Sequence, residues 1–189
     1  MAAVIGRRAR RMRREDALDV MAGWVIVNDL TLREQVWRPD LPELGTDFLA
    51  SKNAPTFLPT GPVLVPRAAV PDPSDLHVTL RLNGEVMQDQ STNDMIFDVA
   101  EIIAHCSNVA TLLPGDLVLT GSPAGNGLAH GRLLRPGDRM DATITRARRT
   151  VHSVRSRTVG ERLMTYRPPY GGLRAATPVT SPGCRYRAR

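Results

Sequence analysis

The stretch Leu119-Thr120-Gly121-Ser122-Pro123-Ala124-Gly125-Asn126-Gly127 begins in an apolar run and opens into a glycine-rich loop. Before it, Pro114-Gly115-Asp116 predicts a turn, and Leu117 to Leu119 predicts a buried strand that leads into the loop. A loop with hydroxyl groups and free backbone N–H groups can bind the anionic oxygens of a carboxylate or a phosphate. The Gly-Lys-Ser/Thr ending of a Walker motif is missing from it. Taken alone, a plain turn is the favoured interpretation of this stretch.

The rest of the chain predicts more short strands than helices. His77 to Leu82 alternates apolar and polar residues and runs into Asn83-Gly84, a dipeptide that strongly signals a tight hairpin. Asp98 is placed to cap a helix whose apolar residues follow helical spacing as far as Val109. Other segments are predicted as strands (2–5, 24–27, 139–145), as a helix (15–22, ended by Gly23) and as a proline-rich loop or string of short strands (38–66). We therefore expect an α+β, mainly β fold.

The composition is that of a folded chain without membrane or disulfide character. Of the 189 residues, 42% are hydrophobic and 23% are charged, as in ordinary globular domains. No uncharged apolar run reaches the roughly 18 residues of a spanning helix. The chain has 2 cysteines, which do not suggest a disulfide framework. We expect a cytoplasmic protein with no membrane partner.

Two charged residues stand out as candidate site residues. Asp29 follows directly on the apolar run Trp24 to Val27, and a carboxylate at the end of a buried strand is costly unless it is paired or binds a metal. Lys52 is the single lysine among 25 Lys+Arg, and its compact ammonium group is not equivalent to a guanidinium. The alternatives stay open, since Asp29 can be a turn cap and Lys52 a chance survivor of the arginine bias. The 4 histidines are interpreted as structural or surface residues.

Several motifs follow one another in a characteristic order. They are Val4-Ile5-Gly6-Arg7, Asn28-Asp29-Leu30-Thr31-Leu32-Arg33-Glu34, Ser51-Lys52-Asn53, Asn83-Gly84-Glu85-Val86-Met87-Gln88-Asp89, Asp94-Met95-Ile96-Phe97, Pro114-Gly115-Asp116 and Leu119 to Gly125. Together they resemble the catalytic C-terminal domain of the fumarylacetoacetate hydrolase family. The resemblance covers residues 2–145 and implies a mixed β-roll fold, a homodimer and one Mg²⁺ or Mn²⁺ ion.

The resemblance also implies a role for each candidate residue. The aspartate of the family's Asn-Asp motif binds the metal, which points to Asp29. The lysine faces the substrate, which points to Lys52 as a catalytic and substrate-binding residue. The Thr-Gly-Thr/Ser loop binds substrate oxygen, which points to Gly121 and Ser122. Many members carry a glutamine seven residues after the aspartate, where this chain has Val36.

The sequence departs from the family pattern at both ends of the similarity. The family's other two metal ligands form a Glu-x-Glu pair just before the Ala-Val-Val-Ile-Gly strand, which here begins at Met1. We therefore expect an N-terminally truncated member that lacks two of the three carboxylate ligands. Residues 146–189 carry 11 arginines and one acidic residue, which gives this segment a net charge of +10. The whole chain has a net charge of +6, so the remaining residues carry a small negative charge. The sequence predicts a partial catalytic domain over 1–145 and an atypical basic, Arg/Pro/Gly-rich tail over 146–189, poorly packed from Thr158.

Three functions are compatible with these observations. The resemblance implies a metal-dependent hydrolase or lyase, or an isomerase, that acts on C–C bonds of 2-oxo or β-diketo acids of the acylpyruvate or fumarylacetoacetate type. The second hypothesis is an inactive remnant of the fold that acts only as a dimer partner. The third is a basic nucleic-acid-binding protein, which is the least favoured because aromatic residues make up only 4% of the chain and no recognised binding motif is present.

Overall fold

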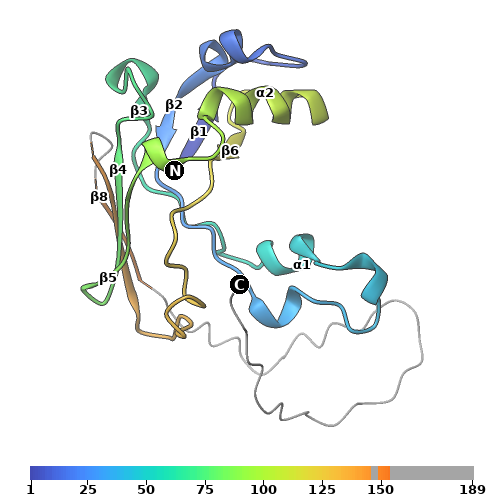
Figure 1. Cartoon of the computed structure of the whole chain (residues 1–189), viewed down its shortest axis with the longest axis vertical. Coiled ribbons are helices and arrows are strands. Elements are labelled where there is room, and N and C mark those ends of the chain that lie inside the picture. Colours follow the sequence, from blue (N-terminus) through green and yellow to red (C-terminus); the bar gives the residue numbers. More distant parts are fainter. Residues whose placement is uncertain (146–148, 154–189) are drawn as a thin grey trace. The chain divides into compact units, whose positions relative to one another are not determined.

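Residues 1–145 and 149–153 are described by a computed structural model, in which they form two antiparallel four-stranded sheets and two α helices (Figure 1). The predicted tail lies outside the described residues except for 149–153. The strands are β1 (Ala2–Ile5), β2 (Met21–Val25), β3 (Val65–Pro66), β4 (His77–Leu82), β5 (Glu85–Ser91), β6 (Leu117–Leu119), β7 (Arg139–Ile144) and β8 (Arg149–Ser153). The helices are α1 (Phe48–Lys52), α2 (Val99–Val109) and the 3₁₀ helices η1 (Arg14–Val20), η2 (Arg33–Gln35), η3 (Pro42–Leu44), η4 (Arg67–Ala69) and η5 (Thr92–Asp94). The predicted α+β, mainly β class is confirmed.

The first sheet has the strand order β3-β2-β1-β6. Its central strand β1 pairs antiparallel with both β2 and β6, and Ala2 lies opposite Val25 on one side and Leu119 on the other. The two flanking strands therefore run in the same direction and both end beside the start of β1. This topology brings the residues after β2, which include Asp29, to the same edge as the loop that follows Leu119.

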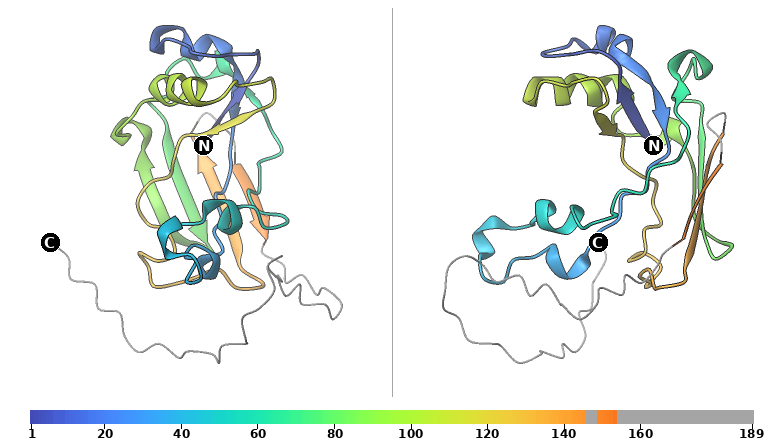
Figure 2. Two further views of the ribbon diagram at one scale, coloured as in Figure 1. Left: turned by 90° about the vertical axis from the view of Figure 1, so that its right-hand side faces the viewer. Right: turned by 180° about the vertical axis from the view of Figure 1, so that it is seen from behind.

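A hydrophobic core lies between the first sheet, α2 and η1. The helices α2 and η1 lie side by side (Figures 1 and 2). Trp24, Ile5 and Ile103 are almost fully buried there. The predicted helix start at Asp98 is confirmed, because its side chain accepts the N–H of Glu101 and the Glu101 carboxylate accepts the N–H of Asp98. Val109, predicted on the apolar face, is instead 73% exposed.

The second sheet has the order β5-β4-β7-β8. The predicted hairpin is confirmed, since Asn83 and Gly84 have φ values of 53° and 90°. The Asn83 side chain donates to Asp138 and accepts the N–H of Arg139, which ties the turn to β7. Hydrogen bonds from the Arg135 N–H and from Asn83 keep the pKa of Asp138 below the usual carboxyl value. Pairing of β8 with β7 continues this sheet beyond residue 145.

The helix predicted over residues 15–22 is wrong in type and extent. The structure has the 3₁₀ helix η1 up to Val20, and β2 begins at Met21. Gly23 lies inside that strand instead of ending a helix. A Cβ there would be 2.1 Å from the carbonyl oxygen of Val65 on β3, so only glycine fits at this position. Close approach of the neighbouring strand is a tertiary constraint that overrides the local helical pattern.

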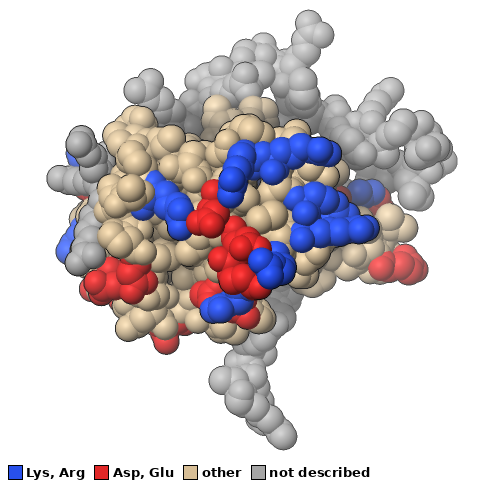
Figure 3. All heavy atoms as spheres, turned by 90° about the horizontal axis from the view of Figure 1, so that it is seen from above, with Lys and Arg blue, Asp and Glu red and all other residues tan. Residues whose placement is uncertain are grey.

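Basic and acidic side chains lie next to one another on the face formed by η1 and α2 (Figure 3). Arg13 forms ion pairs with Glu15 and Asp16, and Arg14 pairs with Asp98. Binding to a phosphate backbone needs a surplus of basic charge, and these contacts partly neutralise the arginine cluster of residues 7–14. That the chain does not bind nucleic acid stays a prediction. Separately, no helix among the described residues has the length and apolar character needed to cross a membrane.

Candidate functional site

The edge at which β2 and β6 end opens on a cavity of about 890 Å³. Asp29 lines it, as do Gly121 and Ser122 of the glycine-rich loop. Thr120 fixes the start of this loop, because its N–H and its hydroxyl group both donate to the carbonyl oxygen of Met1. Three of the four residues singled out in the sequence therefore line the same cavity.

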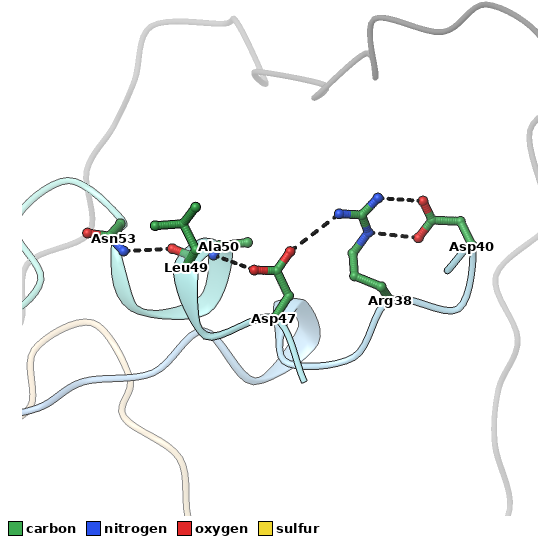
Figure 4. Close-up of polar contacts among 6 residues, drawn as sticks. All are labelled: Arg38, Asp40, Asp47, Leu49, Ala50 and Asn53. Carbon is green, nitrogen blue, oxygen red and sulfur yellow. Dashed lines mark hydrogen bonds and ion pairs between the residues drawn. The ribbon is translucent and has the colours of Figure 1, made fainter. Parts of the chain in front are cut away.

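Lys52 reaches the same region from α1, which lies on a segment that extends away from both sheets (Figures 1 and 2). Figure 4 shows how this short helix is held: the Asp47 carboxylate accepts the N–H of Ala50 at 2.9 Å and pairs with Arg38 at 3.3 Å. Arg38 also binds Asp40 through two nitrogens, which lowers the pKa of Asp40. This helix N-cap and charge network set the direction of α1, and Lys52 is its last residue.

Lys52 and Asp29 form an ion pair in which the Nζ–Oδ2 distance is 2.7 Å. They are 23 residues apart in the chain, so the contact is a product of the fold. Their side chains are 28% and 48% exposed, respectively. The pair lines a second cavity of about 520 Å³ together with Phe57 and Leu119, and these two residues and Asp29 also line the larger cavity. Lys52 and the glycine-rich loop therefore face connected space.

Two residues that line the larger cavity received no role in the sequence interpretation. Arg33, at the start of η2, is partly buried and has no ion-pair partner within the described part of the chain. Gln88 on β5 is buried and donates from Nε2 to the carbonyl oxygen of Pro123 in the loop. Arg33 is a member of the quoted motif of residues 28–34, and its place in that motif was the available signal for it.

The described residues do not complete a site for Mg²⁺ or Mn²⁺. Across residues 1–145 and 149–153, no three side chains of His, Cys, Asp or Glu come together as a group that could hold a metal ion. Asp29 offers one carboxylate, and Lys52 already pairs with it. Mg²⁺ prefers six oxygen ligands in octahedral geometry, so this donor set alone does not fit the ion. We therefore assign no chemical step of this chain to a metal.

Comparison with known proteins gives a consistent set of relatives. A family model for the fumarylacetoacetate (FAA) hydrolase C-terminal domain matches residues 1–155. Oxaloacetate tautomerase YisK of Bacillus subtilis (strain 168) is 40% identical over 146 residues, which make up 76% of this chain and 46% of that protein. The chain thus spans about half the length of the curated relatives it matches.

Solved structures agree with the sequence match. Fumarylacetoacetate hydrolase from psychrophilic Exiguobacterium antarcticum superposes with a TM-score of 0.72 and 36% identity, over 82% of this chain and 55% of that one. Maleylpyruvate hydrolase from Sphingobium sp. SYK-6, in complex with manganese(II) and pyruvate, gives a TM-score of 0.69 and 32% identity, over 82% and 52% of the two chains. The fold expected from the order of motifs is confirmed by these neighbours.

Proposed function

Because the chain belongs to the fumarylacetoacetate hydrolase family, we propose that it binds a 2-oxo or β-diketo acid beside Lys52 and stabilises the enolate of that acid. The observation that carries the proposal is the contact of Lys52 with Asp29, because Asp29 also lines the cavity that Gly121 and Ser122 line. The relatives described above include two hydrolases and a tautomerase. Hydrolysis or lysis of a C–C bond next to a carbonyl and keto–enol tautomerisation share an enolate, so one arrangement supports each of them.

The residues of this chain can supply charge where the enolate forms. Negative charge collects on the carbonyl oxygen of the oxo acid, and a preorganised cation or N–H donor there lowers the barrier. The Lys52 ammonium is held in place by Asp29, so it does not have to reorganise during the reaction. The backbone N–H groups of Gly121 and Ser122 are suited to a second oxygen of the substrate. Arg33 is a further cation for the substrate carboxylate.

A homodimer belongs to the same proposal. The segment that carries α1 exposes Trp37, Phe48 and Leu49, which are 64%, 59% and 78% accessible. Large apolar side chains exposed on one segment are typical of surfaces that another protein covers, and a second copy of the chain is the partner that the family resemblance implies. Sedimentation velocity of the full chain measures this directly.

Acceleration of keto–enol exchange tests the proposed function. The full chain should speed the conversion of enol-oxaloacetate to the keto form, followed by ultraviolet absorbance, and should catalyse deuterium incorporation at C3 of pyruvate, followed by NMR. Both reactions are measured with Mn²⁺ and with a chelator. A folded chain that accelerates neither reaction under either condition would contradict the proposal and favour the inactive remnant.

Metal dependence is tested separately, because Asp29 is a weak site by itself. We expect Mg²⁺ to bind the full chain with a Kd above about 1 mM, since even sites with several oxygen ligands bind Ca²⁺ at roughly 0.1–1 mM when they are weak. Asp29→Asn should abolish what binding remains in calorimetry. Asp19→Asn, which changes an aspartate that pairs with Arg67 on the surface, is the matched control. Micromolar affinity that survives Asp29→Asn would remove Asp29 as a ligand.

A further inference from the structure

A bulge in β5 turns two consecutive side chains to the inside of the protein. Side chains of a regular strand alternate between its two faces, yet Met87 and Gln88 are both buried. The pairing with β4 explains this, because Leu80 lies opposite Gln88 whereas Arg81 lies opposite Val86, which leaves Met87 as an extra residue. Bulges of this kind re-aim side chains and often lie next to functional sites.

Both bulge residues contact the glycine-rich loop. Gln88 Nε2 donates to the carbonyl oxygen of Pro123 at 2.9 Å. The carbonyl oxygen of Met87 lies 3.1 Å from Nε2 of His130 and packs so closely on Gly125 that a Cβ there would come within 1.9 Å of it. The loop is therefore pressed against the strand at the bulge.

The contact from Gln88 is the main anchor of the loop tip. Within the described part of the chain it is the one hydrogen bond made by residues 121–125. Pro123 has no N–H, so its carbonyl oxygen is the backbone group through which this residue can be held. Gly121, with φ of 89° and no atom within 4 Å of a Cβ position, has no packing of its own to fix it.

We propose that Gln88 is a positioning residue, which holds the Gly121–Ser122 segment in the orientation that receives a substrate oxygen. This role rests on the proposed function, because the segment is assigned to substrate there. Gln88 itself does not have to touch the substrate. It acts through Pro123, the residue directly after Ser122. Loss of the Gln88 amide donor should therefore let the N–H groups of Gly121 and Ser122 move away from the positions that the substrate needs.

The first test follows the loop in the protein without ligand. Gln88→Met keeps the length of the side chain and removes the donor, and Gln88→Asn keeps the amide but is one methylene too short to reach Pro123. Net loss of this hydrogen bond should lower the backbone order parameters of Gly121, Ser122, Ala124 and Gly125 in ¹⁵N relaxation, from about 0.85 towards 0.6. It should also shift the NMR signals of Gly121 and Ser122. Gln90→Met is the matched control, because this glutamine on the same strand binds Asp94 instead.

The second test measures the affinity for pyruvate by NMR titration. The Kd should rise about tenfold in both Gln88 variants and stay within twofold in Gln90→Met. Unchanged order parameters of the loop overturn the proposal, and so do lowered order parameters with an unchanged Kd. If the unaltered chain does not bind pyruvate, the proposed function fails, whereas the order parameters still decide whether Gln88 anchors the loop. Unfolding of all variants by denaturant separates a local effect from general destabilisation.

Discussion

Replacing Lys52 by methionine is expected to lower turnover of oxaloacetate or an acylpyruvate by about 10²–10³-fold, the usual loss when one preorganised charge-stabilising contact is removed. Methionine keeps the length and apolar stem of the side chain and removes the positive charge. The side chain is 28% exposed and pairs with Asp29. Because surface ion pairs contribute little to folding, we expect stability to change by less than about 1 kcal/mol. A large loss of turnover with a small loss of stability is the signature of a residue that acts on the substrate.

Lys52→Arg sharpens this test, because it retains the charge. The guanidinium group is wider and planar, so it should not fit the position of the ammonium and should also lose turnover. A surface residue would tolerate the change, with an effect on stability of under about 0.5 kcal/mol. Arg67→Met removes an exposed cation that pairs with Asp19, and it serves as the control. Equal rates and equal pyruvate affinities for the unaltered chain, Lys52→Arg and Lys52→Met would exclude Lys52 from the site.

The parts of the fold that the sequence predicted are those with local causes. Asn83-Gly84 adopts positive φ at both positions, and Asp98 caps the helix that follows it. These signals are carried by a few adjacent residues. The error over residues 15–22 came from assigning Gly23 to a helix end. The place of Gly23 in a strand depends on β3, which is about 40 residues further along the chain and packs against it. No local pattern reports that approach.

The candidate site divides in the same way. Asp29, Lys52, Gly121 and Ser122 were found through their motifs, and the structure brings Asp29 next to Lys52. The ion pair itself could not be predicted, because it requires α1 to be oriented by Asp47. The bulge at Met87 was equally hidden, since register between strands is set by tertiary packing and a bulge leaves no mark in the alternation of so short a segment.

The tight contact between the loop and the bulge makes Gly125 a position with a large expected effect on stability. Gly125 has φ of 101°, and a Cβ there would lie 1.9 Å from the carbonyl oxygen of Met87. Positive φ costs a residue other than glycine about 1–3 kcal/mol. The clash adds about 1–3 kcal/mol more, because a backbone carbonyl cannot move aside as the end of a flexible side chain would.

Gly137→Ala separates these two contributions to the effect of Gly125→Ala. Gly137 has φ of 92°, but nothing lies within 4 Å of its Cβ position, so its alanine variant carries the backbone cost without the clash. Chemical denaturation of the full chain should therefore show Gly125→Ala to be less stable than Gly137→Ala by about 1–3 kcal/mol. Gly125→Ala should also weaken binding of pyruvate, because the loop must leave the bulge to make room for the methyl group. Equal stability of the two variants would mean that the loop is not packed against β5, and the anchoring role of Gln88 would be lost with it.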